Sequence, residues 1–349
     1  MTLKTLSAEQ RRQLVDTQQV YEAWRATSQE GKRRFAGSMR WSKRHETEYL
    51  LRKIGKSETS VGPRNKKTED AYQAFFQGRK QNTDRLVGLS ARIDELAPVN
   101  VAMGLTRVPL IAARILRTCD EQELLGEQLL VVGTNALYAY EVLAGVQADS
   151  GLIATGDIDL LYDARRHISL AVSGITTNGL IGLLQTVDAS FAPTSPRSFR
   201  AVNKTGYLVD LIRPEAKDVF RDRLPAGLTN LPEDLEGAAI FGLAWLINSP
   251  KLEAIAVDEK GYPVRLVVID PRAFALHKAW VSNRQDREPL KAMRDLEQAK
   301  AAAIIATQYL KKTFDAADLA ALPNELRNMA PKLLADVTTA TKRSTTPNW

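Results

Sequence analysis

The stretch from Leu129 to Tyr162 restricts the choice of fold more than any other part of the sequence. Its residues predict a short buried strand, then a helix over 135–143 and a second strand over 158–162. Gly133 lies between the first strand and the helix, where a residue without a side chain lets the backbone approach a ligand. The helix that begins near Thr134 offers free N–H groups and the positive end of its dipole. The stretch therefore predicts a turn that binds a phosphate-bearing ligand, in a domain with both strands and helices.

Two carboxylates stand at the start of the second strand. Side chains two apart on a strand point to the same face, so Asp157 and Asp159 converge while Ile158 and Leu160 face the core. Paired carboxylates are hard oxygen ligands that suit Mg²⁺ (or Mn²⁺) when substrate phosphates complete the coordination shell. Two such ions can activate an attacking hydroxyl and stabilise a leaving pyrophosphate. Taken alone, the pair is weak evidence for a metal site, because acidic residues are common at strand ends.

A third acid, Asp210, interrupts the otherwise apolar strand Leu208–Ile212. Burial of an unpaired carboxylate there would cost roughly several kcal/mol of folding free energy, so a cation partner is expected. Two interpretations remain open. Asp210 either ligates a metal ion beside the first two acids or forms a salt bridge with Arg200 or Arg213.

These motifs occur together in a known superfamily. The chain resembles the polymerase-β-type nucleotidyltransferases in the runs VVGTNALYAYE, TGDIDLLYD and YLVDLI. More narrowly, GTNAL and TGDID look like the AbiEii/MenT branch of bacterial toxin-antitoxin and phage-defence systems. Ser60–Arg64 and Phe274–Lys278 are similar to an uncharacterised bacterial family of nucleotidyltransferase-fold proteins. The resemblance covers about residues 38–300.

The resemblance implies a nucleotide pocket that extends beyond the acids. Gly133 and Thr134 would bind the triphosphate, although Gly or Ser is usual where Thr134 stands. Lys278 and Arg284 would grip phosphate oxygens, and Asp295 would orient one of these cations or an ion. For the last three residues the alternative is an ordinary solvated helix face.

The resemblance also implies a reaction. Asp157, Asp159 and Asp210 would be the catalytic and metal-binding residues in the transfer of NMP from an NTP, ATP among the candidates, to an acceptor hydroxyl. The acceptor would be RNA, a protein or a small molecule, and an antitoxin or another protein partner is expected in the toxin branch. The alternatives are a toxin-type phosphotransferase that moves the γ-phosphate and a non-catalytic module that binds nucleotide or nucleic acid.

Positive charge is concentrated at the beginning of the chain. The first hundred residues carry 20 Lys and Arg against 12 Asp and Glu, whereas the rest carries 28 against 29. The clusters lie at 32–34, 40–44 and 64–67. Such a distribution favours an anionic partner, and RNA is the partner expected. The alternative is a solvated helical surface or a contact with an acidic protein.

The order of the predicted elements favours an α+β fold: a nucleotidyltransferase (polymerase-β-like) core with a mixed sheet, flanked by helical regions. We expect a basic helical N-terminal region over 1–100, the core over 101–270 and a helical region over 271–349. Residues 32–67 show no sustained period and predict short elements and loops. Thr68 is expected to cap a long helix that ends near Leu96, before Pro98. Further elements are expected as a helix over 177–187, a hairpin of strands 199–202 and 207–212, and strands over 252–257 and 264–269.

Composition indicates a soluble, cytoplasmic protein without a membrane contact. No apolar run of about 18 residues occurs, and the first residues lack the apolar stretch of a signal peptide. The single Cys119 cannot form an internal disulfide, and no Cys/His cluster has zinc spacing. His277 is expected to have a structural role.

Overall fold

The computed structural model describes residues 3–165, 179–216, 225–315 and 317–345. Contacts between residues divide the chain into two compact units, each of which is described by itself. The first consists of Met1–Arg11, Thr106–Glu259 and Val264–Trp349, and the second of Arg12–Leu105 and Lys260–Pro263.

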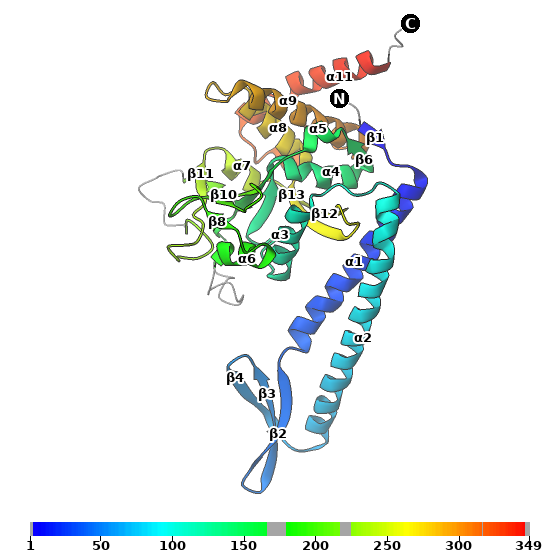
Figure 1. Ribbon diagram of the computed structural model, residues 1–349, viewed down its shortest axis with the longest axis vertical. Coiled ribbons are helices and arrows are strands. Elements are labelled where there is room, and N and C mark those ends of the chain that lie inside the picture. The colour runs from blue at the N-terminus through cyan, green and yellow to red at the C-terminus, as the bar shows by residue number, and fades with distance from the viewer. Residues whose placement is uncertain (1–2, 166–178, 217–224, 316, 346–349) are drawn as a thin grey trace. The chain divides into compact units, whose positions relative to one another are not determined.

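A mixed sheet forms the centre of the first unit, with strand order β12-β13-β5-β7-β10-β9-β8 and β11 beside β10 (Figure 1). β7 is antiparallel to β5 and parallel to β10, and β9 returns antiparallel to β10. The mixture of strand directions and the many helices are consistent with the α+β class. The strands are β5 (Leu129–Val132), β7 (Asp157–Tyr162), β8 (Ala192–Pro193), β9 (Arg200–Val202), β10 (Leu208–Pro214), β11 (Ala238–Ile240), β12 (Lys251–Val257) and β13 (Pro263–Ile269).

Helices of the first unit pack on this sheet and on one another. Every residue of β5 is buried, and Ile158 and Leu160 of β7 are fully buried, as strands covered on the core side require. The same core takes in Phe274 of α8 and Ala302 of α9. A short antiparallel pair, β1 (Leu3–Thr5) with β6 (Val146–Ala148), completes the strands. The helices are α3 (Leu110–Glu121), η1 (Gly133–Asn135), α4 (Ala136–Ala144), α5 (Ser150–Ile153), α6 (Gly179–Val187), α7 (Leu243–Ile247), α8 (Pro271–Ser282), α9 (Pro289–Ile304), η5 (Ile305–Tyr309), η6 (Ala317–Leu319), α10 (Asn324–Arg327) and α11 (Ala330–Thr345).

Two long antiparallel helices, α1 (Ala8–Arg34) and α2 (Lys66–Ala102), dominate the second unit (Figure 1). Hydrogen bonds tie them together at intervals: Asn82 Nδ2 donates to the Thr27 carbonyl at 2.9 Å, and Gln13 Nε2 donates to Asn100 Oδ1 at 2.9 Å. Because polar bonds as well as packing join these helices, the pair keeps its register over a largely polar length.

An antiparallel sheet of β2 (Ser38–Arg44), β3 (Thr47–Ile54) and β4 (Ser57–Pro63) follows α1. The sequence predicted only short elements and loops here. The register of β3 with β4 shifts between Leu50 and Leu51, and both leucines are buried. A bulge of this kind breaks the alternation of inward and outward residues, so the sheet leaves no period-two signal.

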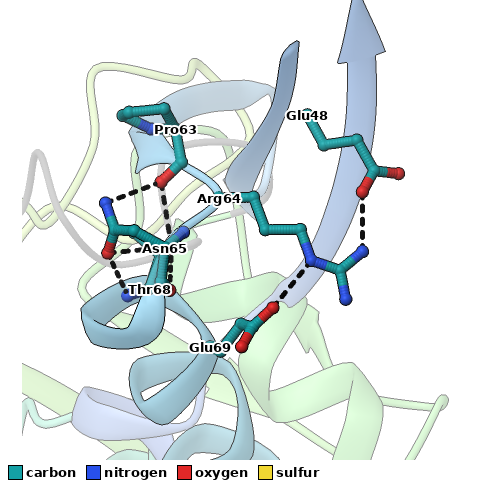
Figure 2. A network of polar contacts seen from close by, with 6 residues as sticks. All are labelled: Glu48, Pro63, Arg64, Asn65, Thr68 and Glu69. Atoms are coloured by element: carbon teal, nitrogen blue, oxygen red, sulfur yellow. Dashed lines mark hydrogen bonds and ion pairs between the residues drawn. The ribbon is translucent and has the colours of Figure 1, made fainter.

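The junction of β4 and α2 corrects the expected start of that helix (Figure 2). Asn65 is the N-cap and accepts from the Thr68 backbone N–H, while the Thr68 hydroxyl accepts from the Asn65 N–H. Thr68 is thus the third helical residue of a capping box rather than the cap.

The expected end of α2 was also wrong, because the helix passes through Pro98 and continues to Ala102. Pro98 removes only one backbone donor, and tertiary bonds hold the following turn. Asn100 is fully buried and donates to the Gly261 carbonyl at 2.8 Å.

Most other predicted elements are confirmed, including the strands near 252–257 and 264–269 and the hairpin of β9 and β10. The helix expected over 177–187 is α6, whose first two expected residues lie outside the described ranges. None of the described helices combines the length and apolar character needed to cross a membrane.

Candidate active site

The turn between β5 and α4 has the geometry that requires a glycine. Gly133 has φ of 62°, in the left-handed region. A Cβ atom at this position would lie 2.0 Å from Oδ2 of Asp159. Asp159 therefore occupies the space that any other residue at 133 would need, and the turn and the acidic strand are in direct contact.

The three acids lie on two neighbouring strands. Asp159 of β7 is directly opposite Asp210 of the parallel strand β10, and Asp157 is opposite Leu208. Thr155 donates its hydroxyl to the Asp157 carboxylate. Asn135 Nδ2 donates to the Asp157 backbone oxygen at 2.8 Å, which fixes the start of β7 to the turn. The structure thus brings together the turn and the three predicted acids.

Negative charge accumulates at Asp159. The pKa of this carboxyl is raised to about 6, because burial and the charge of Asp157 raise it more than the charge of Lys278 lowers it. Asp210 contributes in the same direction as Asp157. Within this cluster the acids are therefore only partly neutralised by their neighbours, and a cation would be stabilised here.

Asp210 is not free in the structure. Arg200 on β9 donates from Nε to Oδ1 at 2.7 Å and from Nη2 to Oδ2 at 2.5 Å. The bidentate pair raises the pKa of Arg200, and the charges of Asp157 and Asp159 add to the effect. Arg213, the other expected partner, donates to the Gly237 carbonyl. The salt bridge to Arg200 is therefore present, and a metal-binding role for Asp210 stays a prediction.

Of the cations expected from α8 and the segment after it, Lys278 is close enough to lower the pKa of Asp159. Lys278 Nζ lies 2.7 Å from Oδ1 of Asp295, and Arg287 Nη2 lies 2.6 Å from Oδ2 of the same buried carboxylate. Arg284 instead pairs with Asp286 at 2.6 Å. Lys278 and Asp295 are thus brought together, whereas the nucleotide role of Arg284 has no contact to support it.

His277 is half-buried beside Lys278, with its Nε2 atom buried. Burial lowers its pKa to about 3, and the charge of Lys278 acts in the same direction. The imidazole is therefore neutral at physiological pH, in keeping with the structural role expected for it.

Helix α9 supplies polar contacts from Arg294 and from Gln298, and the sequence did not single out Gln298. Gln298 Nε2 donates to the Thr134 hydroxyl and to the Leu152 carbonyl, both at 3.1 Å, and its Oε1 is buried without a partner. Arg294 donates to the Ala154 carbonyl. No local signal in the sequence joins Gln298 to the turn, because it lies 164 positions from Thr134 and only the tertiary fold brings the two residues together.

A cavity of about 650 Å³ opens next to the acidic strand. Thr155, which contacts Asp157, lines it together with the rings of Tyr138 and Tyr207. Arg107 and Arg114 also line it, and Arg107 is held by Glu141 at 2.8 Å. Asp188 and Glu259 line the cavity as well, so aromatic rings, hydroxyl groups and charges of both signs surround it.

The geometry of the acids decides whether they can hold a metal ion. Among the described residues, no group of three or more His, Cys, Asp or Glu is arranged to hold a metal ion. Asp210 has both oxygens engaged by Arg200, which leaves Asp157 and Asp159 as two hard-oxygen donors on one face of β7. Two carboxylates and an excess of negative charge fit a divalent cation whose remaining ligands are water and substrate.

A comparison with models of protein families matches residues 111–323 to the family described as "Nucleotidyltransferase". The match includes the turn, the three acids and Lys278. Neither the curated proteins nor the solved structures contain a match to this chain.

Proposed function

The chain belongs to the nucleotidyltransferase family, and from this premise we propose that it transfers a nucleotidyl group from an NTP to an acceptor hydroxyl. The acceptor oxygen forms a bond to the α-phosphorus, the bond from that phosphorus to the bridging oxygen breaks, and pyrophosphate leaves. The hydroxyl proton passes to a base in the site.

One observation carries the proposal: Gly133 abuts Asp159, and Asp159 lies opposite Asp210 on the next strand. A turn with free N–H groups therefore borders directly on a cluster of acids. Such a turn can bind phosphate and such a cluster of acids can bind cations, and a nucleoside triphosphate needs both.

The residues take the following roles in this proposal. The turn at Gly133 and Thr134 binds the triphosphate, and Lys278 adds a point charge to it. Arg284 would reach the phosphates only by leaving Asp286. Asp295 keeps Lys278 in position, since it holds the ammonium at 2.7 Å.

Asp157 and Asp159 would hold Mg²⁺ or Mn²⁺. Such an ion, when bound, supplies positive charge to the α-phosphate and to the leaving pyrophosphate. Asp210 would join these ligands and accept or orient the proton of the acceptor hydroxyl.

We also propose the finer classification. The mixed sheet with β5, the turn, α4 and β7 supports a polymerase-β-like core. The runs GTNAL and TGDID support the AbiEii/MenT branch, in which case an antitoxin or other protein partner is expected. RNA is our preferred acceptor because the excess positive charge lies in the first hundred residues.

The reaction is tested with NTPs labelled with ³²P at the α- or the γ-phosphate, in the presence of Mg²⁺ or Mn²⁺ and total RNA. We expect transfer of the label from the α-labelled NTP and release of labelled pyrophosphate from the γ-labelled NTP. Transfer of the γ label with NDP formation would identify a phosphotransferase, and transfer of neither label would leave a binding module. Asp157→Asn and Asp159→Asn should each reduce transfer by about 100- to 1,000-fold or more. Asp315→Asn, at an exposed acid of the same unit with no role in the proposed site, should retain activity.

A further inference from the structure

We propose that Arg200 is a positioning residue. It holds Asp210 away from the metal ion and the acceptor hydroxyl until a substrate phosphate binds the Arg200 guanidinium in place of Asp210. The inference rests on the proposed function, since it assigns Asp210 to the same site.

Both carboxylate oxygens of Asp210 are engaged by Arg200. Each of its carboxylate oxygens accepts a hydrogen bond from Arg200, at 2.7 and 2.5 Å, from a residue placed directly opposite on β9. A divalent cation that approached these oxygens would meet the positive charge of the guanidinium. In this arrangement Asp210 neither ligates a cation nor accepts a proton readily.

The Arg200 guanidinium contacts Asp210 and lies within electrostatic range of Asp157 and Asp159, since the charges of all three acids raise its pKa. A cation bound by Asp157 and Asp159 would therefore repel Arg200. This repulsion weakens the grip on Asp210 when the site is loaded.

The exposure of Arg200 allows its guanidinium to leave Asp210. Its side chain is 37% exposed, whereas that of Asp210 is 8% exposed. The guanidinium already lies 5.4 Å from the centre of the Phe199 ring, which is itself partly exposed. A phosphate offers the same two-point geometry as a carboxylate, so an incoming phosphate competes directly for Arg200.

A static salt bridge is the competing explanation, and the two differ in how Arg200 and Asp210 are coupled. If the bridge masks Asp210, Arg200→Lys should expose it, because an ammonium keeps the charge but loses the fork that engages both oxygens. If Arg200 acts only by its charge, Lys should behave as Arg does.

The test is a Mn²⁺ titration of the nucleotide-free protein, followed by electron paramagnetic resonance of the free ion. Arg200→Lys should tighten Mn²⁺ binding about tenfold, a common size for coupling between contacting charges. In an Asp210→Asn background the same substitution should change nothing. Arg197→Lys, whose partner Glu236 is 3.7 Å away and outside the acid cluster, is the matched control. Unchanged Mn²⁺ affinity in Arg200→Lys, or an equal change in both backgrounds, would overturn the proposal.

The phosphate step has a separate readout. Isothermal titration calorimetry with sodium tripolyphosphate in EDTA should show weaker binding to Arg200→Gln than to the parent protein, by about tenfold. Equal binding would contradict the release of Arg200 to phosphate. Melting temperatures show whether each variant folds. If Arg200→Lys does not fold, Arg200→Gln replaces it in the Mn²⁺ cycle, and a larger gain in affinity with Asp210 present than in the Asp210→Asn background is then the expected result. Neither titration requires turnover, so a failure of nucleotidyl transfer is distinguishable from a failure of Arg200 to release Asp210.

Discussion

The carboxylate of Asp159 fills the position in which a side chain at Gly133 would stand. The distance from a Cβ built at Gly133 to Asp159 Oδ2 is 2.0 Å, and to its Cγ 3.0 Å. The turn at Gly133 and the acidic strand β7 are therefore positioned against each other by direct contact, so a side chain in the turn must move Asp159.

Gly133→Ala should therefore impair both folding and activity. The left-handed φ of 62° costs an alanine about 1 to 2 kcal/mol, and displacement of Asp159 should lower kcat by about 100-fold. Gly145→Ala is the matched control, since its φ is 64° but its Cβ would meet only the Arg11 side chain, with Cδ nearest at 3.6 Å. The control should lose similar stability, measured by denaturant unfolding, and keep its activity. Equal activity of the two variants would show that the contact with Asp159 is unimportant.

The raised pKa of Asp159 makes a prediction about stability. Its folded pKa of about 6 exceeds the ordinary value of 3.8, so between these pH values the native state binds more protons than the unfolded state. Stability therefore falls as pH rises through this window. Asp159→Asn lacks the penalty and should stabilise the metal-free protein by up to about 3 kcal/mol above pH 6, with no gain below pH of about 4.

Thermal unfolding in EDTA from pH 4 to 8 measures this effect. Asp163→Asn serves as a control of opposite sign. Burial raises the pKa of Asp163, but hydrogen bonds from Arg165 outweigh it and the net pKa is lowered, so this variant should lose stability at neutral pH. A melting temperature of Asp159→Asn equal to or below that of the parent at pH 8 would contradict the predicted charge accumulation.

Lys278→Ala should weaken NTP binding with little effect on the fold. Asp295 keeps its second partner, because Arg287 Nη2 lies 2.6 Å from Oδ2. Loss of a charge-assisted bond to phosphate should raise KM for NTP about 10- to 100-fold. Arg287→Ala removes the other partner of Asp295 and should leave KM nearly unchanged. Steady-state kinetics of the two variants decide the assignment, and equal KM values would place Lys278 outside the nucleotide site.

The sequence predicted those parts of the fold that depend on local pattern. Apolar runs bounded by turn residues indicated β5, β7 and β10, and the spacing of Asp157 and Asp159 placed both acids on one face. Gly133 was recognisable because a glycine between a strand and a helix lets the backbone approach a ligand, and its positive φ in the structure is a second reason for a glycine there.

What the sequence missed depends on distant contacts or on broken periodicity. The bulge between Leu50 and Leu51 concealed a sheet. Arg200 was one of two possible partners of Asp210, and only the pairing of β9 with β10 selects it. Arg287 and Gln298 had no local signal, since their roles come from packing of α8 and α9.

The N-terminal cations differ in how firmly they are held. Arg64 is fixed between Glu48 at 2.6 Å and Glu69 at 2.8 Å, as Figure 2 shows. Arg34 pairs with Glu30, and Arg40 pairs with Glu58. Within the described residues, other exposed cations of this unit have no ion pair or side-chain hydrogen bond: Arg33, Lys43, Arg44 and Lys53. The second group, unlike the first, is available to phosphates without loss of an existing contact.

If RNA is the acceptor, the unpaired cations should account for its salt-dependent binding. Each neutralised phosphate contributes about 0.7 to 0.9 to the slope of log K against log salt, so four lost contacts should flatten the slope by about 3. We therefore expect weaker tRNA binding and a flatter slope for the variant with Ala at 33, 43, 44 and 53, with unchanged KM for NTP. A variant with Gln at 34 and 40 removes two exposed charges already paired and should change the slope by less than about 1. Fluorescence anisotropy with labelled tRNA over a range of salt concentrations measures both. Parallel slopes for the parent and the fourfold variant would exclude this surface as the RNA site and leave an acidic protein as the partner to test.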